Sequence, residues 1–292
     1  VHDDAVGGMM RLIDENSGLP NASAPTSASA ELEVRGLRKR LPDGSCLLED
    51  ISFRVRRGEF VGLLGASGAG KSLTLRCVLG LSSTSGGSIR FRDDAGCVHD
   101  LVGLGGRRLR EARRRMGVIF QGANLVSRLR VIENVMIGRL GYTSPWRAWL
   151  LGFDDAEARA AMEALARTRI AHLAARVTGS LSGGELQRVA IARAVHQDPD
   201  LYLADEPISS LDPGNARAIM ELLRPLAAER PVLGVFHQPD MVAAYCTRAI
   251  GIKGGCMCYD GDPAVPADAL REIYGEELAT LRAPEPARLA QP

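Results

Sequence analysis

The sequence predicts an α/β layer fold with a largely parallel sheet and an inserted helical subdomain. Short runs of β-type composition alternate with helical patterns, which is typical of layered α/β folds. Between residues 122 and 179 the strand signal disappears and the sequence is helical instead. The β-type runs are Glu31–Val34, Ile51–Val55, Phe60–Leu64, Ser88–Arg92, Val118–Phe120, Leu201–Ala204, Val232–Phe236 and Ala249–Lys253.

Length and composition indicate one globular domain without a membrane span. The chain has 292 residues, of which 46% are apolar, so it can bury a sizeable core. Its 36 Lys and Arg balance 35 Asp and Glu, and the net charge of +1 gives no reason to expect nucleic acid as a partner. No run approaches the roughly 20 apolar residues that span a bilayer. Residues 1–16 are acidic and unlike a signal peptide, so we expect a cytoplasmic chain.

Both ends of the chain are expected to lack fixed structure. Residues 17–30 (SGLPNASAPTSASA) are mainly Ala, Ser and Pro, and they cannot offset their ordering entropy by burial. We therefore predict a disordered extension over residues 1–30 and a flexible tail over residues 283–292.

Two helices are clear in the sequence. Asp212 is a favourable N-cap and Pro213 suits a first helical position, while Pro225 should kink or end the helix. The helix face consists of apolar residues at helical spacing, Ile219, Leu222, Leu223 and Leu226. An Ala-rich helix is predicted over residues 155–174, and the inserted helical subdomain is assigned to about residues 122–180.

Three local features each allow two interpretations. The arginine-rich run Arg107–Arg115 could bind nucleic acid or anionic lipid, but its spacing favours a solvated helix face. Cys256 and Cys258 could hold a metal, although reduced structural cysteines are the better interpretation. Trp146 and Trp149 either pack in the core or grip a partner subunit.

A glycine-rich loop follows the predicted strand Glu59–Leu64 and opens an apolar helix, Leu73–Leu81. It fits GxxxxGK[ST], in which backbone N–H groups and the helix N-terminus face phosphates. Lys71 would reach the β and γ oxygens, and Ser72 would offer its hydroxyl to Mg²⁺. A plain turn is the alternative, but Lys71 and Ser72 both stand in register. The predicted nucleotide site comprises Gly65, Ala66, Ser67, Gly68, Ala69, Gly70, Lys71 and Ser72.

Two carboxylates end the apolar run that begins at Leu201. A buried central strand delivers acidic groups in this way to the carboxyl edge of a sheet. Asp205 would hold Mg²⁺, directly or through water, and Glu206 would orient the attacking water. Taken alone, these two carboxylates would more often be solvated acids at a strand end. The phosphate loop in the same sequence makes the catalytic interpretation the better one.

The segment Leu181–Arg188 (LSGGELQR) resembles the signature motif of ABC ATPases. Ser182, Gly183 and Gly184 begin a predicted helix, so a hydroxyl, backbone donors and a helix dipole face an anion. The resemblance implies that this anion is the γ-phosphate of ATP held by a second subunit. It therefore implies a homodimer of ATPase subunits with ATP and Mg²⁺ between them.

The resemblance extends to three further positions. Gln121 matches the Q-loop glutamine, which senses Mg²⁺ and the γ-phosphate and faces the membrane partner. Ser210 to Asp212 match the D-loop, and His237 matches the switch histidine that contacts the γ-phosphate. Residues 31–282 are thereby identified as an ABC ATPase nucleotide-binding domain, which implies a P-loop NTPase core and an antiparallel β portion.

Within this family the sequence is most similar to the ATP-binding subunits of phosphonate importers. The similar stretches are 119–121, 124–126, 128–129, 131–141, 204–213, 237–238 and 273–275. The resemblance implies transmembrane permease subunits as partners and, indirectly, an extracytoplasmic solute-binding protein. It also implies a peripheral position on the cytoplasmic face of the cell inner membrane.

Four positions depart from the family pattern. Leu41 stands where an aromatic residue usually stacks on adenine, and Leu73-Thr74 reverses the usual order of the two residue types after Ser72. Glu185-Leu186 replaces two glutamines in the signature motif, and Pro239 replaces an aliphatic residue.

Other functions remain open at this point. An importer ATPase for phosphite, phosphate or another small solute would carry the same motifs. Soluble ABC ATPases of DNA repair separate their motifs with a long coiled coil, and those of translation carry two cassettes. Neither feature is present in this sequence. A P-loop kinase of small molecules would not account for the segment Leu181–Arg188.

Overall fold

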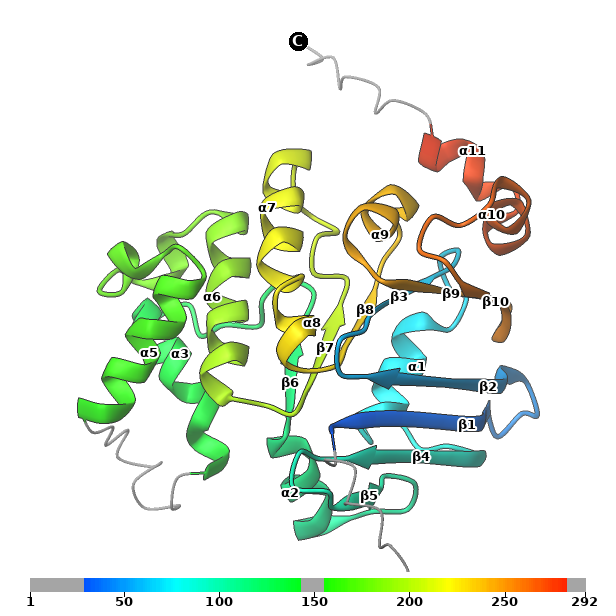
Figure 1. Cartoon of the computed structure of the whole chain (residues 1–292), viewed down its shortest axis with the longest axis horizontal. Coiled ribbons are helices and arrows are strands. Elements are labelled where there is room, and N and C mark those ends of the chain that lie inside the picture. Colours follow the sequence, from blue (N-terminus) through cyan, green and yellow to red (C-terminus); the bar gives the residue numbers. More distant parts are fainter. Residues whose placement is uncertain (1–28, 143–154, 283–292) are drawn as a thin grey trace, which may run out of the picture.

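The computed structural model describes residues 29–142 and 155–282 (Figure 1). The tail that we predict to be flexible, the tryptophans Trp146 and Trp149, and the predicted extension up to residue 28 lie outside the described residues. Residue 30, which we assigned to the extension, is packed: the Ala30 side chain is buried and its N–H donates to Asp94 Oδ1. Burying an alanine side chain costs almost no conformational entropy, so Ala30 can pack at the edge of the core.

A six-stranded sheet forms the centre of the molecule, in the order β10-β9-β3-β8-β7-β6. All neighbouring pairs are parallel except β10 and β9, which form an antiparallel edge hairpin. The predicted α/β fold with a largely parallel sheet is therefore confirmed. The strands are β3 (Phe60–Leu64), β6 (Met116–Ile119), β7 (Leu201–Asp205), β8 (Val232–Val235), β9 (Arg248–Lys253) and β10 (Cys256–Gly261).

The antiparallel portion is a separate four-stranded sheet in the order β2-β1-β4-β5. Two of its strands, β1 and β2, are about twice as long as the sequence patterns indicated, because register shifts in their pairing interrupt the alternation of apolar and polar residues. The short β5 was missed, and both of its end residues are exposed. These strands are β1 (Glu31–Arg40), β2 (Cys46–Arg56), β4 (Gly86–Arg92) and β5 (Val98–Asp100).

The large sheet is buried on both faces, and its strands alternate between two cores. In β3, Phe60 and Leu64 belong to one apolar cluster, whereas Val61 and Leu63 belong to the other. Successive side chains of a strand point to opposite faces, so a strand covered on both sides is a continuous apolar run. The first cluster lies against α6 (Gly183–Gln197), and the second lies between the two sheets and α1 (Lys71–Val78).

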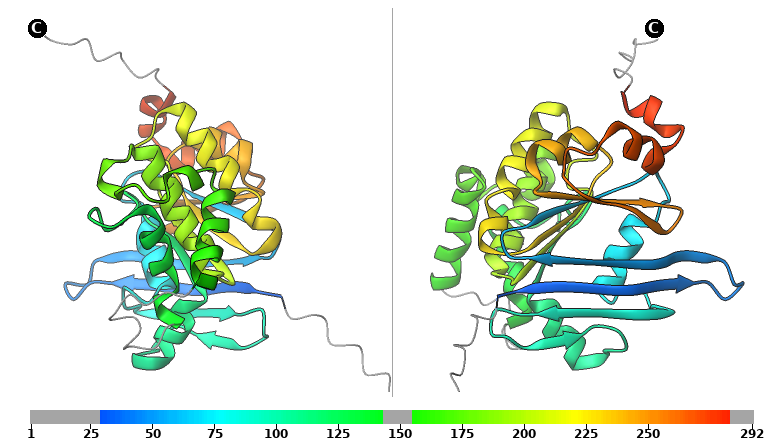
Figure 2. Two further views of the ribbon diagram at one scale, coloured as in Figure 1. Left: turned by 90° about the vertical axis from the view of Figure 1, so that its left-hand side faces the viewer. Right: turned by 45° about the vertical axis from the view of Figure 1, so that its right-hand side comes forward.

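The helical subdomain packs to one side of the large sheet, opposite the small sheet (Figures 1 and 2). Its longest predicted helix ends at Arg167 instead of Ala174, where the Thr168 hydroxyl donates to carbonyls of the last turn and Arg169 takes a φ of 63°. The subdomain elements are α3 (Val131–Met136), α5 (Asp155–Arg167) and the 3-10 helices η1 (Ile137–Tyr142), η2 (Ala171–Leu173) and η3 (Thr178–Ser180). Helix α6 packs on both α3 and α5.

Helix α7 begins where the sequence signals place its start. Asp212 caps α7 by accepting the N–H groups of Gly214 and Asn215, and α7 stops two residues before Pro225. Among the described residues, no helix is long and apolar enough to cross a membrane. The remaining helices are α2 (Gly106–Arg114), α7 (Pro213–Leu223), α8 (Leu226–Glu229), α9 (Pro239–Tyr245), α10 (Ala267–Tyr274) and α11 (Glu277–Arg282).

The structure places two of the ambiguous sequence features. Only Ala112 is buried in the arginine-rich helix α2, as expected for a solvated face. Arg113 is anchored there because its guanidinium donates to the carbonyls of Leu79 and Gly80. Cys256 and Cys258 are free thiols on β10, and the described residues contain no group of three His, Cys, Asp or Glu arranged to hold a metal.

Candidate nucleotide site

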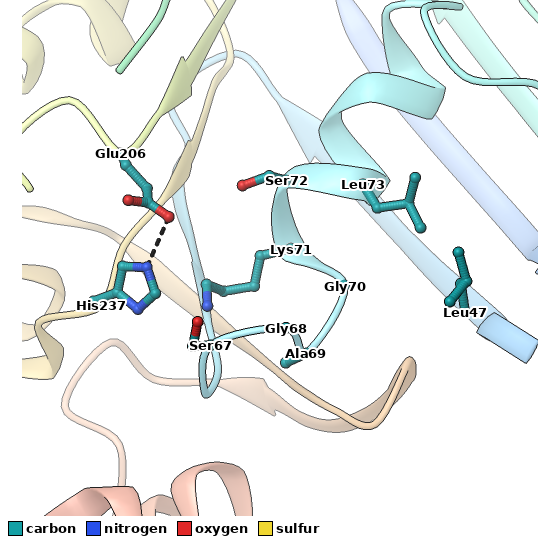
Figure 3. Close-up of a pocket in the computed structure, with 10 residues that line it drawn as sticks. All are labelled: Leu47, Ser67, Gly68, Ala69, Gly70, Lys71, Ser72, Leu73, Glu206 and His237. Carbon is teal, nitrogen blue, oxygen red and sulfur yellow. Dashed lines mark hydrogen bonds and ion pairs between the residues drawn. The ribbon is translucent and has the colours of Figure 1, made fainter. Parts of the chain in front are cut away.

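The loop of residues 65–72, which we call the phosphate loop, joins β3 to α1 at the carboxyl edge of the large sheet. Gly70, the residue before α1, has a φ of 107°, and a Cβ there would lie 2.6 Å from Leu48 Cδ2. Only glycine fits this backbone position. The loop forms one wall of a cavity of about 220 Å³. The cavity is lined by Leu47, Ser67, Gly68, Ala69, Gly70, Lys71, Ser72, Leu73, Glu206 and His237 (Figure 3).

Lys71 lies inside the phosphate loop and is 4% exposed. Its Nζ donates to the carbonyls of Gly65 at 2.6 Å and Ala66 at 2.9 Å. Burial lowers the pKa of the Lys71 ammonium, and the carboxylates of Glu206, Glu277 and Asp205 oppose that shift. The site therefore concentrates one cation among three acidic groups.

Ser72 and Asp205 meet although they lie 133 residues apart in the sequence. The Ser72 hydroxyl donates to Asp205 Oδ1 at 2.7 Å. Ser72 is the second residue of α1, and Asp205 is the last residue of β7. A hydroxyl and a carboxylate at this separation are the oxygen ligands that suit Mg²⁺. The chemistry of this pair therefore fits the predicted metal position.

Glu206 and His237 form the second contact of the site. His237 Nε2 lies 2.7 Å from Glu206 Oε1, as the dashed line in Figure 3 marks. Glu206 has a φ of 49°, which is unusual for a residue with a side chain. Such backbone strain persists where the surroundings fix it, and it is frequent at functional sites. The strained turn directs the Glu206 carboxylate into the cavity, beside Lys71 and Ser72.

Gln121 does not line the cavity. Its Nε2 donates to Ser209 Oγ at 3.2 Å, and Ser209 Oγ in turn donates to the Glu206 carbonyl at 3.2 Å. The structure therefore connects Gln121 to the site through Ser209, a residue that the sequence patterns did not single out.

Ser182, Gly183 and Gly184 do not line the cavity, and they stand at the N-terminus of α6. Both the N–H and the hydroxyl of Ser182 donate to Glu185 Oε2, at 2.7 and 2.8 Å. These donors hold the pKa of Glu185 below its ordinary value. The predicted signature residues and the phosphate loop therefore do not form one site within a single chain.

The contacts around the site include residues that sequence reasoning missed. Leu47 lines the cavity, whereas Leu41 lies in the β1–β2 turn with 38% of its surface exposed. Glu277 of α11 accepts the Ser67 N–H at 3.1 Å, and the Tyr274 hydroxyl donates to the His237 carbonyl at 3.3 Å. No local pattern indicates these contacts, because they depend on where the end of the chain packs.

Two of the departures from the family pattern, Leu73-Thr74 and Pro239, have local explanations. Leu73 lines the cavity, while the buried Thr74 hydroxyl donates back to the Gly70 carbonyl at 3.0 Å. Pro239 is the first residue of α9, a position that suits proline.

Residues 48–209 match the model of the "ABC transporter" family. The chain is 44% identical over 249 residues to phosphonates import ATP-binding protein PhnC 1 of Rhodopseudomonas palustris strain HaA2, covering 84% of this chain and 87% of that protein. It is also 44% identical over 266 residues to phosphonates import ATP-binding protein PhnC of Nitratidesulfovibrio vulgaris strain Hildenborough, covering 89% and 98%.

The chain also resembles solved structures of ABC transporter ATP-binding cassettes. The chain is 29% identical to cbiO1 of Clostridium perfringens, part of the ABC transporter complex cbiONQ, with a TM-score of 0.67 and coverage of 80% and 88%. A dimeric ATP-binding cassette in a post-hydrolysis state with ADP and Pi is also 29% identical, with a TM-score of 0.68 and coverage of 80% and 98%.

Proposed function

The chain belongs to the ATP-binding proteins of ABC transporters, and from this premise we propose that it powers the import of phosphonates. It is the ATPase subunit of an ABC importer. The observation that supports phosphonate as the solute is the similarity, over most of the chain, to proteins that carry phosphonate import in their names.

Lys71 and the N–H groups of the phosphate loop bind the nucleotide phosphates in this proposal. Two of the three N–H donors of Lys71 Nζ are engaged with the carbonyls of Gly65 and Ala66, and we expect these donors to turn to the phosphates. The phosphate oxygens then replace those carbonyls as acceptors for a buried ammonium.

Ser72 and Asp205 would hold Mg²⁺ beside the phosphates. The ion, when bound, neutralises charge on the phosphate oxygens. The hydroxyl of Ser72 now donates to Asp205, so the two oxygens already lie 2.7 Å apart. This arrangement needs little reorganisation of either side chain.

Glu206 orients and polarises the attacking water. Its carboxylate lines the cavity, and His237 Nε2 lies 2.7 Å from Oε1, so one carboxylate oxygen is engaged with His237. His237 is thus a positioning residue for Glu206 as well as a candidate contact for the γ-phosphate. Phosphoryl transfer depends mainly on such positioning and on charge neutralisation.

Two copies of the chain complete each site in this proposal. Ser182, Gly183 and Gly184 present donors at the start of α6 but, among the residues that the structure describes, they do not share a cavity with the phosphate loop. ABC cassettes form dimers, and a head-to-tail pair would bring this helix start over the partner's phosphate loop. The Ser182 hydroxyl must then turn from Glu185 toward the phosphate.

The permease docks at a groove beside Gln121. A cavity of about 320 Å³ separates the large sheet from the helical subdomain, and its wall includes Phe120 and Ile137. Arg193 of α6 donates to the carbonyls of Ala123 and Asn124, so it ties the loop after Gln121 to α6. Movement at Gln121 therefore reaches the groove through packed contacts. The chain would thereby work as a peripheral subunit on the cytoplasmic face of the membrane.

Transport assays test the solute. The chain, its permease and its solute-binding protein would be assembled in vesicles, and uptake of a radiolabelled alkylphosphonate would be compared with that of phosphate and phosphite. We expect ATP-dependent uptake of the phosphonate, abolished by Lys71→Ala. Uptake of phosphate or phosphite without phosphonate uptake would contradict the proposed solute while leaving the ATPase assignment intact.

A further inference from the structure

A carboxylate of the C-terminal region lies on the phosphate loop. Glu277 Oε2 accepts the backbone N–H of Ser67 at 3.1 Å across 210 residues of sequence. Ser67 is in the part of the loop whose N–H groups bind phosphate oxygens in this motif. The Glu277 carboxylate therefore occupies, with an anionic oxygen, a donor that the nucleotide also needs.

Buried residues on both sides hold Glu277 in place. Tyr274 at the end of α10 and Leu278 in α11 are buried in the same apolar cluster. Gly275 makes the corner between the two helices with a φ of 55° and a ψ of −128°, a conformation that favours glycine. The corner is further tied to the site, because the Tyr274 hydroxyl donates to the His237 carbonyl. The position of Glu277 is thus set by packing.

The charges around the loop make this contact sensitive to nucleotide. Glu277 is one of three carboxylates, with Glu206 and Asp205, that favour the charged form of Lys71. A phosphate group that enters the loop brings further negative charge next to Glu277, which is exposed to solvent. The backbone N–H of Ser67 has a single proton, so the carboxylate must give way if a phosphate oxygen is to accept it.

We propose that Glu277 is an internal competitor of the nucleotide and that binding of ATP or ADP displaces its carboxylate from Ser67. The C-terminal corner then reports nucleotide occupancy and weakens nucleotide affinity. The proposal rests on nucleotide binding at the phosphate loop and is independent of the transported solute.

Affinity for a fluorescent ADP analogue tests the competition, because ADP occupies the loop without requiring a second subunit. Glu277→Gln removes the charge and Glu277→Ala removes the acceptor, and each should bind about 2- to 10-fold more tightly than the full native chain. Glu276→Gln is the matched control, since it makes the same charge change at the adjacent exposed residue and should leave the affinity unchanged. The gain should shrink in high salt.

Hydrogen exchange of residues 275–282 gives a second measurement. In the native chain ADP should speed exchange in this segment, whereas in Glu277→Ala exchange should already be fast without ADP. Equal affinities of the native chain and both Glu277 variants, or an equal gain in Glu276→Gln, would overturn the role of Glu277. Unchanged exchange on ADP binding would also overturn it. Failure of the native chain to bind ADP at all would overturn the nucleotide site itself.

Discussion

Glu206 is held at its position by several independent interactions. Its backbone has a positive φ, its N–H donates to the Val235 carbonyl at 3.2 Å, and its carboxylate contacts His237. The neighbouring Asp205 contacts Ser72 instead. Two adjacent carboxylates therefore have separate partners, which supports separate roles for them in catalysis.

Glu206→Gln should retain ATP binding and lose most of the hydrolysis. An amide keeps the shape of the carboxylate but cannot polarise water as a base, so we expect turnover to fall by about 10²-fold or more. Phosphate release by the assembled transporter measures the change, and the same variant should trap the closed dimer. Turnover close to the native value would contradict the role given to Glu206.

Leu41→Tyr should tighten ATP binding if residue 41 faces the adenine. A new stacking contact would contribute about 1 kcal/mol. Leu47→Tyr is the comparison, because Leu47 lines the cavity whereas Leu41 lies in the exposed turn. Nucleotide titration of both variants shows which residue faces the adenine. Tighter ATP binding by Leu47→Tyr alone would show that the alignment at residue 41 is wrong.

At the scale of single elements, α6 shows how a helix terminus can serve both folding and binding. Ser182 and Glu185 form a reciprocal capping box that satisfies the first donors of the helix. The Ser182 hydroxyl that would donate to a phosphate is engaged with Glu185. The Ser182 hydroxyl has one proton, which it can donate either to Glu185 or to a phosphate oxygen. Binding of an anion therefore competes with the contact that stabilises the start of the helix.

The cap should make the stability of the chain depend on the ionisation of Glu185. Because its pKa is lowered from the ordinary 4.5, its stabilising contribution is present above that value and is lost as the pH falls through the lower folded-state pKa. Glu185→Gln keeps a capping side chain but does not titrate. The difference in Tm between the native chain and Glu185→Gln should therefore shrink on acidification from about pH 5 to about pH 3.

The same change at the exposed Glu163 of α5 provides the control. A Tm difference for Glu185→Gln that is constant over this range, or one that tracks the Glu163 control, would argue against an ionised cap.

At the scale of the whole molecule, the groove beside Gln121 lies where the two layers meet. The large sheet supplies one wall through Val118, and the helical subdomain supplies the other through Ile137 and Gly138. Because Arg193 crosses from α6 to the loop at residues 123–124, the layers cannot shift without changing the groove. This property suits a surface that passes motion to a partner.

Ile137→Asp should weaken permease binding with little change in the melting of the free subunit. Ile137 is half-buried in the groove, so a charge there would lose its water on docking without a partner. Co-purification with the permease and thermal melting would be measured together. Val98→Asp on the small sheet is the control, since Val98 is 56% exposed and lies away from the groove.

The contrary outcome is that Ile137→Asp melts early while each folded molecule still binds the permease. That outcome would place Ile137 in the core and not in the interface. The same two measurements on Trp146→Ala and Trp149→Ala should separate docking from core packing at those positions. Both tryptophans lie outside the residues that the structure describes.

The sequence by itself determined the features that depend on a few neighbouring residues. The glycine-rich loop, the carboxylates that end β7 and the capped start of α7 are local patterns, because backbone conformation and capping act over only a few positions. The alternation of β-type and helical segments similarly predicted the fold class. The lengths of β1 and β2 were underestimated, since their irregular register hides the alternation.

Only the tertiary structure decided which distant residues meet. Ser72 contacts Asp205, and Ser67 contacts Glu277, because the order of strands in the sheet and the packing of α10 and α11 bring those segments to one edge. Leu47 and Ser209 reach the site and its surroundings in the same way. The order of the strands and the packing of α11 depend on the total apolar surface that the fold buries. Local sequence patterns do not encode that total.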